Sequence, residues 1–308
     1  MKQVFLMGPT ASGKTKLAMQ LCDEFPVSLI SVDATQIYKD CNIGAAKLPQ
    51  QELERYPHAL VDIISPAESF SVDAFINQYQ SNLNSIENQG TIPLLVGGSM
   101  MYFNAIFNPL DKIPKTTPEI REEVEALIRK NGLDWLYEQV KKNDPGIKFA
   151  TSDKQRIQRA YEVFLISGKP LTSFYSGGEK YNENDLNFLK IALIPEDRKK
   201  LHQSIYQRTQ DMLDQGLVDE VESLIKKYPN LSWESNSMRS IGYRQVGMYL
   251  RGEIRFDELF DKILFATRQL AKRQITWLRS MQNLLVLDPF EKDISDQLNQ
   301  SLKNFLKS

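Results

Sequence analysis

Short apolar runs alternate with segments of helical spacing along the first hundred residues. The apolar runs are VFLM from Val4 to Met7, VSLISV before Asp33, LVDII from Leu60 to Ile64, and TIPLLV before Gly97 and Gly98. KLAMQL after the first run, and Phe75, Ile76 and Tyr79 before the last, have helical spacing. Continuous apolar strands alternating with helices are typical of a parallel sheet covered on both faces. The pattern therefore predicts an α/β fold.

The alternation breaks at NPLDKIPKTTP, from Asn108 to Pro118, whose three prolines are typical of a linker or turn. From Glu119 to Gly168 the period is helical, and we predict no strand there. The polar segment SGGEKYNENDLN, which starts at Ser176, predicts a loop, and FLKIALI resumes a strand pattern at Phe188. Two long helical stretches are predicted after Asp197, and LLVLD near Leu284 predicts a last strand.

This organisation predicts two domains. Residues 1–114 and 188–308 would form a catalytic core with a phosphate-binding loop and basic C-terminal helices. Residues 115–187 would form a helical domain inserted in that core.

Composition narrows the class of protein. The chain has 308 residues, 42% of them apolar, and only two cysteines, Cys22 and Cys41. These values exclude a disordered chain and a disulfide framework, and we expect structural thiols in a reducing cytoplasm. No apolar run is long enough to span a membrane, and the glycine-rich loop follows the N-terminus too soon for a signal peptide. Nothing requires more than a monomer. The formal net charge of −1 argues, by itself, against a nucleic-acid partner.

The segment GPTASGKT fits the pattern G-x-x-x-x-G-K-[ST] and lies between a predicted strand and a predicted helix. It predicts a phosphate or diphosphate site made of Gly8, Pro9, Thr10, Ala11, Ser12, Gly13, Lys14 and Thr15. The glycines let successive N–H groups point inward, and the helix N-terminus adds positive potential. Lys14 would supply a charge for a terminal phosphate, and Thr15 a hydroxyl for Mg²⁺.

Asp33 closes the second apolar run, where it would face the glycine loop across the carboxyl edge of the sheet. It could act as a general base, or it could be a helix cap or loop aspartate. No carboxylate ends the fourth run, and this absence weakens the interpretation as an NTPase that uses Mg²⁺.

Arg208 lies on a stripe with Leu201, Ile205 and Met212, spaced by four, three and four residues. An inward-facing arginine could clamp a diphosphate with its planar guanidinium group. Alternatively, its stem packs and its charged end reaches water.

The C-terminal third is locally basic. Residues 238–280 contain nine Arg or Lys against four Asp or Glu, a net charge of +5. Arg268, Lys272 and Arg279 share one helical face near Trp277, an arrangement that suits a phosphate backbone. A solvated helix face is the alternative.

Taken together, these segments resemble the tRNA dimethylallyltransferases, also called tRNA isopentenyltransferases. Seven segments carry the resemblance in the family's order: GPTASGKT from Gly8, ISVDATQIYKDCNIGAAK from Ile30, PHALVDI from Pro57, PLLVGGSMMYF from Pro93, SDKQRIQRAYEVFLISGKPLT from Ser152, RSIGYRQ from Arg239, and ATRQLAKRQITWLR from Ala266. Two departures are small: Ala34 stands where the family more often has serine, and Ser99 where it usually has threonine.

The resemblance implies transfer of a dimethylallyl group from dimethylallyl diphosphate to N6 of the adenine at position 37 of tRNA, beside the anticodon. It implies catalytic roles for Asp33, Thr15 and Arg208, with Mg²⁺ bound at Thr15, and a flipped adenine. The helical insertion would grip the anticodon stem-loop. The implied tRNA contacts are Asp33, Ala34, Thr35, Gln36, Ser99, Arg121, Ser152, Asp153, Lys154, Gln155, Arg156, Arg239, Ser240, Ile241, Gly242, Tyr243, Arg244, Lys272, Arg273, Gln274, Ile275, Thr276, Trp277, Leu278 and Arg279.

Two other functions remain open from the sequence. A small-molecule or nucleoside kinase would use Asp33 to bind the acceptor hydroxyl. A non-catalytic RNA-binding module would use the basic helix but leave the complete glycine loop without a role.

Overall fold

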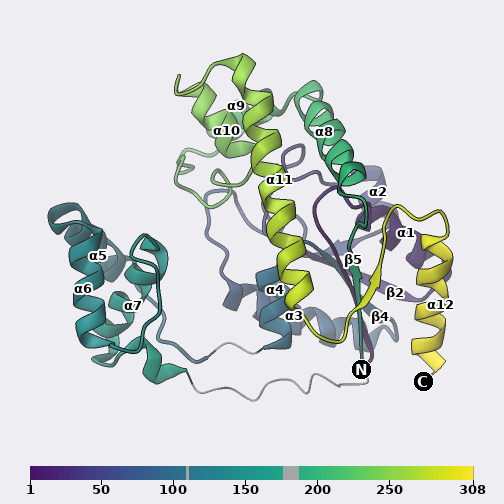
Figure 1. Ribbon diagram of the computed structural model, residues 1–308. Helices are drawn as coiled ribbons and strands as arrows, with labels where there is room; N and C mark the ends of the chain where they lie inside the picture. Colours follow the sequence, from purple (N-terminus) through teal and green to yellow (C-terminus); the bar gives the residue numbers. More distant parts are fainter. Residues whose placement is uncertain (109–110, 176–186, 308) are drawn as a thin grey trace. The chain divides into compact units, whose positions relative to one another are not determined.

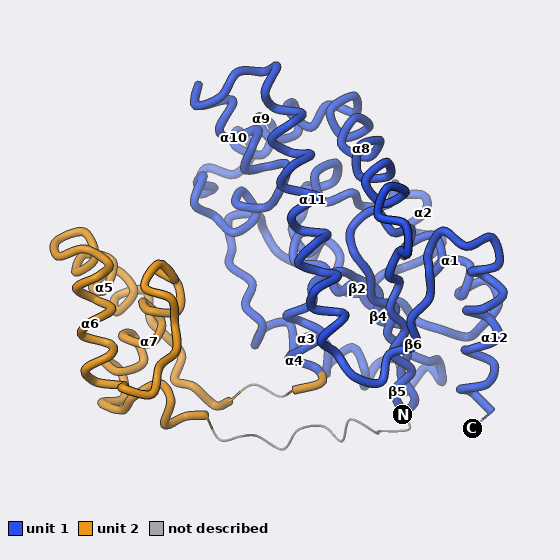
Figure 2. Tube along the Cα trace, viewed as in Figure 1, with its two compact units in different colours: residues 1–106, 182–308 blue, residues 107–181 orange. Residues whose placement is uncertain are grey.

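The computed structural model describes residues 1–108, 111–175 and 187–307 (Figure 1). The chain divides into two compact units (Figure 2). Unit 1 comprises residues 1–106 and 182–308, and unit 2 comprises residues 107–181. From the sequence we predicted an inserted domain of residues 115–187, so the borders differ by a few residues at each end. The proline-rich segment belongs to unit 2, because Ile113 packs against the core of that unit.

The core of unit 1 is a six-stranded, all-parallel sheet. Its strands are β1 (Gln3–Met7), β2 (Val27–Val32), β3 (His58–Ala59), β4 (Ile92–Gly97), β5 (Phe188–Leu193) and β6 (Leu285–Leu287). The spatial order is β3-β2-β4-β1-β5-β6. This confirms the predicted α/β fold. After β1 the chain crosses β4 to reach β2, whereas after β4 it crosses β1 to reach β5. The connections therefore reverse direction between β1 and β4, where ligands of such sheets bind.

The predicted third strand, Leu60 to Ile64, is wrong in position. Leu60 and Asp62 have left-handed backbone conformations, with φ of 67° and 56°. A pleated strand cannot continue through such residues. The strand is instead the short β3, and Ile64 makes only an isolated bridge to Tyr38.

Helices cover both faces of the sheet. Alternate strand residues such as Val4 and Leu6 pack against α1 (Lys14–Glu24) and α12 (Ile294–Lys307), which lie side by side in Figure 1. On the other face, Phe5 meets Phe103 of α4 (Met100–Phe107) edge to face, and α3 (Val72–Asn88) packs on β4. Because side chains alternate along a strand, each strand contributes to both layers. Among the described residues, no helix has the length and apolar content to cross a bilayer.

Four helices, rather than the two predicted, lie between Asp197 and β6. They are α8 (Arg198–Asp214), α9 (Leu217–Lys227), α10 (Tyr243–Leu250) and α11 (Phe256–Ser280). Gly216, with φ of 91°, separates the first two, and turns over residues 228–242 separate the next pair. Their apolar faces form a second core with Ile37, Tyr38 and Cys41 from the loop after β2. The short helix α2 (Gln50–Arg55) precedes β3.

Unit 2 is a helical unit, as predicted for this region. It contains α5 (Pro118–Asn131), α6 (Leu133–Asn143), α7 (Lys154–Ser167) and the single 3-10 turn η1 (Leu171–Phe174), and its described residues include no strand. Thr117 caps α5 by accepting from the Ile120 N–H, and Gly168 ends α7 in a left-handed conformation. The predicted polar loop from Ser176 lies outside the described residues, apart from Asn187.

Candidate functional site

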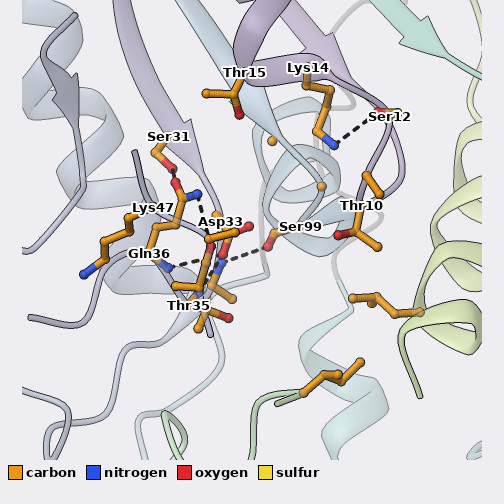
Figure 3. Close-up of a pocket in the computed structure, with 18 of the residues that line it drawn as sticks. Thr10, Ser12, Lys14, Thr15, Ser31, Asp33, Thr35, Gln36, Lys47 and Ser99 are labelled. Carbon is orange, nitrogen blue, oxygen red and sulfur yellow. Dashed lines mark hydrogen bonds between the residues drawn. The ribbon is translucent and has the colours of Figure 1, made fainter. Parts of the chain in front are cut away.

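A cleft of about 1040 Å³ lies along the carboxyl edge of the sheet in unit 1. The loops after β1, β2 and β4 line it, together with α8 and α11. Figure 3 shows Lys14 and Thr15 of the glycine loop above Asp33 and Ser99. The structure thus brings together residues that the sequence selected from three different loops.

The glycine loop has the local geometry that its sequence predicts. Gly13 adopts a left-handed conformation, with φ of 77°, and is the N-cap residue directly before α1. A side chain would be strained there, and the turn directs the first helical N–H groups toward the loop. The Lys14 ammonium donates to the Pro9 carbonyl at 2.6 Å, so it is held inside the curve of the loop. Thr15 lines the cleft beside it.

Lys14, Arg208 and Asp33 form an electrostatic cluster. Burial, reinforced by the charge of Arg208, lowers the pKa of Lys14 to about 7, and Asp33 opposes this shift. Burial also lowers the pKa of the Arg208 guanidinium, again opposed by Asp33. Two desolvated cations against one carboxylate favour an anionic ligand, because such a ligand would offset the repulsion between them. Arg208 lines the cleft, as an inward-facing arginine would, and its binding of a diphosphate stays a prediction.

The carboxylate of Asp33 is fixed by the loop that follows it. Its Oδ1 accepts from the backbone N–H groups of Thr35 and Gln36, at 2.8 and 3.3 Å. The side chain thus stabilises a turn, which was one of the two interpretations of the sequence. Within the described part of the chain, every hydrogen bond identified for this side chain uses Oδ1. Oδ2 remains able to accept a proton from a ligand.

Ser99 joins the loop after β4 to the loop after β2. Its hydroxyl accepts from the Ala34 N–H at 3.0 Å. A serine supplies this acceptor as well as the threonine of the family pattern would. Ala34 takes part through its backbone, so the missing side-chain hydroxyl does not affect this contact.

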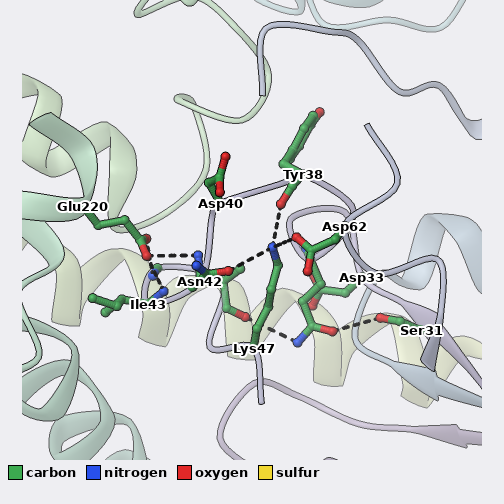
Figure 4. A network of polar contacts seen from close by, with 12 residues as sticks. Ser31, Asp33, Tyr38, Asp40, Asn42, Ile43, Lys47, Asp62 and Glu220 are labelled. Atoms are coloured by element: carbon green, nitrogen blue, oxygen red, sulfur yellow. Dashed lines mark hydrogen bonds and ion pairs between the residues drawn. The ribbon is translucent and has the colours of Figure 1, made fainter. Parts of the chain in front are cut away.

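A buried lysine braces the loop after β2 (Figure 4). The Lys47 side chain is only 2% exposed and pairs with Asp62. Its ammonium also donates to the Tyr38 carbonyl at 2.6 Å. Further along the loop, Glu220 of α9 accepts from the N–H groups of Asn42 and Ile43, at 3.0 and 2.7 Å. Lys47 and Glu220 were missed, because nothing in the residue pattern distinguishes a charge that braces a loop from a solvated one.

The basic helix α11 lines the cleft with Arg273, Gln274 and Trp277. Lys272 and Arg279 on the same helix are exposed. From the preceding segment, Arg239, Ser240 and Ile241 also line the cleft, and Arg244 is exposed nearby in the sequence. Positively charged side chains therefore lie in and near the same cleft as the glycine loop, within unit 1.

Five residues that the resemblance implies as RNA contacts are buried, although one of them, Gln274, lines the cleft. These residues are Gly242, Tyr243, Gln274, Ile275 and Leu278. Tyr243 is fully buried and donates to Glu220 at 2.7 Å, so it holds two helices together. Ile275 and Leu278 pack inward along α11. A continuous run of contacts cannot lie on one face of a helix, and only the outward positions of this run are accessible.

Thr276 is exposed on α11, and the remaining predicted RNA contacts lie in unit 2. Arg121 of α5 pairs with the buried Glu162 at 3.8 Å, while its own side chain is 60% exposed. Asp153 caps α7 by accepting from the Arg156 N–H at 3.2 Å. Ser152, Lys154, Gln155 and Arg156 are exposed. These residues form a polar, accessible start to α7.

The described residues contain no cluster of three or more His, Cys, Asp or Glu side chains arranged to hold a metal ion. The Thr15 hydroxyl lines the cleft beside Lys14, and a hydroxyl is a ligand that Mg²⁺ accepts when phosphate oxygens supply most of its coordination. A magnesium ion at Thr15 stays a prediction. Cys22 and Cys41 are both free thiols, and Cys41 is buried.

A parallel sheet with a glycine loop at its switch point and a cationic cleft defines the class of α/β proteins that bind phosphorylated ligands. The sequence profile described as IPP transferase matches residues 36–281. The tRNA dimethylallyltransferase of Legionella pneumophila (strain Corby) is 42% identical over 310 residues, covering 98% of each chain. That of Hydrogenovibrio crunogenus is 40% identical, covering 96% of this chain and 92% of the relative. The chain belongs to the tRNA dimethylallyltransferase family.

Solved structures agree with this assignment. The full-length tRNA isopentenylpyrophosphate transferase of Bacillus halodurans superposes with a TM-score of 0.70 at 30% identity, covering 99% of this chain and 98% of that one. A eukaryotic dimethylallyltransferase acting on tRNA has a TM-score of 0.81 at 24% identity, a likeness of fold. The predicted family resemblance is confirmed.

Proposed function

We propose that this protein transfers a dimethylallyl group from dimethylallyl diphosphate to N6 of the adenine at position 37 of tRNA, releasing diphosphate. The observation that carries the proposal is the convergence of Lys14, Arg208 and Asp33 on one cleft in a chain of this family. Two cations suit a diphosphate, and a carboxylate suits an attacking amine. Family membership favours this function over the kinase.

The diphosphate would lie in the glycine loop, against Lys14, Thr15 and Arg208. As the bond between the allylic carbon and the diphosphate oxygen breaks, negative charge grows on the leaving group. Preorganised cations stabilise that charge more in the transition state than in the bound substrate. Mg²⁺ held by the phosphate oxygens and the Thr15 hydroxyl would add further charge neutralisation.

Asp33 would receive the proton of the nucleophile. The adenine amine attacks the allylic carbon, a nitrogen–carbon bond forms, and one proton leaves the nitrogen. Oδ2 of Asp33 accepts that proton, while Oδ1 remains bound to the Thr35 and Gln36 N–H groups. Because those N–H groups fix the carboxylate, it needs little reorganisation during the reaction.

The adenine must leave its base stack to reach this carboxylate. Trp277, 41% exposed at the cleft, offers an aromatic surface, and Arg273 and Arg239 offer charge for the backbone. In unit 2, Arg121 and the exposed residues around the start of α7 would contact the anticodon stem-loop. The protein would act as a cytoplasmic monomer.

The deciding experiment incubates the protein with dimethylallyl diphosphate, Mg²⁺ and an unmodified tRNA with adenines at positions 36 to 38. The tRNA is then digested and its nucleosides are separated by mass. We expect N6-isopentenyladenosine and one equivalent of pyrophosphate. Absence of the product with intact protein would refute the proposal, and ATP-dependent phosphorylation of a small acceptor would favour the kinase.

A further inference from the structure

The most buried polar side chain on the cleft face of α11 is an amide that contacts two loops of the sheet. Gln274 is 7% exposed. Its Oε1 accepts from the Thr10 N–H of the glycine loop at 2.9 Å, and its Nε2 donates to the Gly98 carbonyl at 2.8 Å. These backbone groups follow β1 and β4, so one side chain joins both sides of the switch point.

The close approach depends on Gly98. A Cβ atom at this position would lie 2.4 Å from Gln274 Nε2 and 3.2 Å from the Gly8 carbonyl oxygen. Any other residue would therefore displace the amide. The next residue, Ser99, accepts from the Ala34 N–H, beside Asp33. The amide thus lies at the junction of the loops that carry the glycine motif and the catalytic carboxylate.

We propose that Gln274 is a positioning residue that fixes the glycine loop for the diphosphate, rather than a contact to the RNA. The Thr10 N–H is occupied by Gln274 and so does not face a ligand. Fixing it sets the direction of the following N–H groups, which form the cradle. The proposal rests on the proposed function for the identity of the diphosphate substrate.

The first test replaces the amide with a side chain of similar size, Gln274→Met. This change leaves the Thr10 N–H and the Gly98 carbonyl without partners in a buried place, and the loop relaxes to find others. Inorganic pyrophosphate with Mg²⁺, titrated calorimetrically, is the probe, and we expect its Kd to rise about tenfold or more. The affinity for an anticodon stem-loop RNA, measured by filter binding, should stay close to that of the wild type.

Lys272→Met is the matched control on the same helix, two residues earlier and exposed. It should show the opposite result, with weaker RNA binding and unchanged pyrophosphate binding. If Gln274→Met weakens RNA binding and leaves pyrophosphate binding unchanged, the side chain is an RNA contact and the proposal is wrong.

Gln274→Glu supplies a pH signature that a purely structural role would not give. An ionised carboxylate still accepts from the Thr10 N–H but repels the Gly98 carbonyl, whereas a protonated carboxyl can donate to it. Burial raises the pKa of a carboxyl, so lowering the pH favours the protonated form. We expect the ratio of kcat/KM for this variant to that of the wild type to rise as the pH falls from 8 to 6. A constant ratio would overturn the proposal.

If Gln274→Met does not fold, as judged by thermal melting, the pH signature of Gln274→Glu decides. The experiments distinguish failure of the proposed function from failure of this inference. If the proposed function is wrong, the wild-type protein forms no isopentenyladenosine. If only the inference is wrong, the Kd for pyrophosphate is the same in Gln274→Met and in the wild type.

Discussion

At the scale of single residues, Asp33 shows how one side chain can serve both structure and chemistry. The sequence predicted its position at the carboxyl edge but left two roles open. The structure assigns loop stabilisation to Oδ1, and our mechanism assigns the proton to Oδ2. The glycine loop and Arg208 were also predictable, because motif and helical spacing determine where those side chains lie. The burial of Gln274 was not predictable, because a polar residue in a basic run does not reveal that it is buried.

Asp33→Asn should separate these two roles. Asparagine keeps an oxygen acceptor for the Thr35 and Gln36 N–H groups but cannot accept the proton at neutral pH. We expect kcat to fall about 100-fold or more in the tRNA assay, with pyrophosphate binding retained. Unchanged turnover would remove Asp33 from the mechanism.

Lys14 should make diphosphate binding depend on pH. Its pKa is lowered to about 7 by burial and by Arg208, so the free protein loses this charge as the pH rises through that value. A bound anion favours the ammonium and raises the pKa, so binding at pH 8 should take up a proton. Calorimetry in buffers of different ionisation enthalpy measures that uptake.

Lys14→Met should abolish the proton uptake and weaken pyrophosphate binding at every pH. Uptake that persists in this variant would assign the titration to another group.

At the scale of elements, the loop after β2 is held by a buried lysine and a half-buried glutamate. The Lys47 ammonium donates to the Tyr38 carbonyl of this loop, and the Glu220 carboxylate of α9 accepts from the Asn42 and Ile43 N–H groups. The sequence predicted the four long strands, because continuous apolar runs of that length are distinctive. It misplaced the third strand and missed two of the C-terminal helices. Left-handed residues such as Leu60, and the turns before α10, depend on tertiary contacts such as these.

Lys47→Met should loosen this loop. The Tyr38 carbonyl loses a charged donor and Asp62 loses its partner. We expect the free energy of unfolding to fall by about 2 kcal/mol, measured by urea denaturation. Turnover should fall with it, because the same loop fixes Asp33.

The matched control is Lys39→Met, on an exposed lysine of the same loop. It should change the free energy of unfolding by less than about 0.5 kcal/mol. Equal effects of the two variants would contradict the bracing role of Lys47.

At the scale of the whole molecule, the net charge of −1 conceals an uneven distribution. The region of residues 238–280 carries +5, and its exposed members include Arg239, Arg244, Lys272 and Arg279. A binding surface for one folded RNA needs local positive charge, and a near-neutral remainder limits nonspecific association. Whole-chain composition therefore argued against an RNA partner, whereas the local charge count predicts where the RNA would bind.

Lys272→Ala combined with Arg279→Ala should weaken binding of the anticodon stem-loop and flatten its salt dependence. Loss of two phosphate contacts lowers the slope of log K against log salt by about 1.4. The control, Lys292→Ala with Lys303→Ala, removes two exposed lysines outside that region and should leave the slope unchanged. Equal slopes for both double variants would assign the RNA to another surface.

The placement of β1 between β4 and β5 has a consequence for synthesis on the ribosome. The central strand is made first, but its second neighbour follows only after the whole of unit 2. The Lys2 ammonium, moreover, donates to the Phe305 carbonyl at 2.8 Å, and Glu24 of α1 accepts from Asn299 of α12 at 2.7 Å. Unit 2 is continuous in the chain and has its own apolar core, so it can fold during translation. Unit 1 must keep its first strands unaggregated until its last helix has been made.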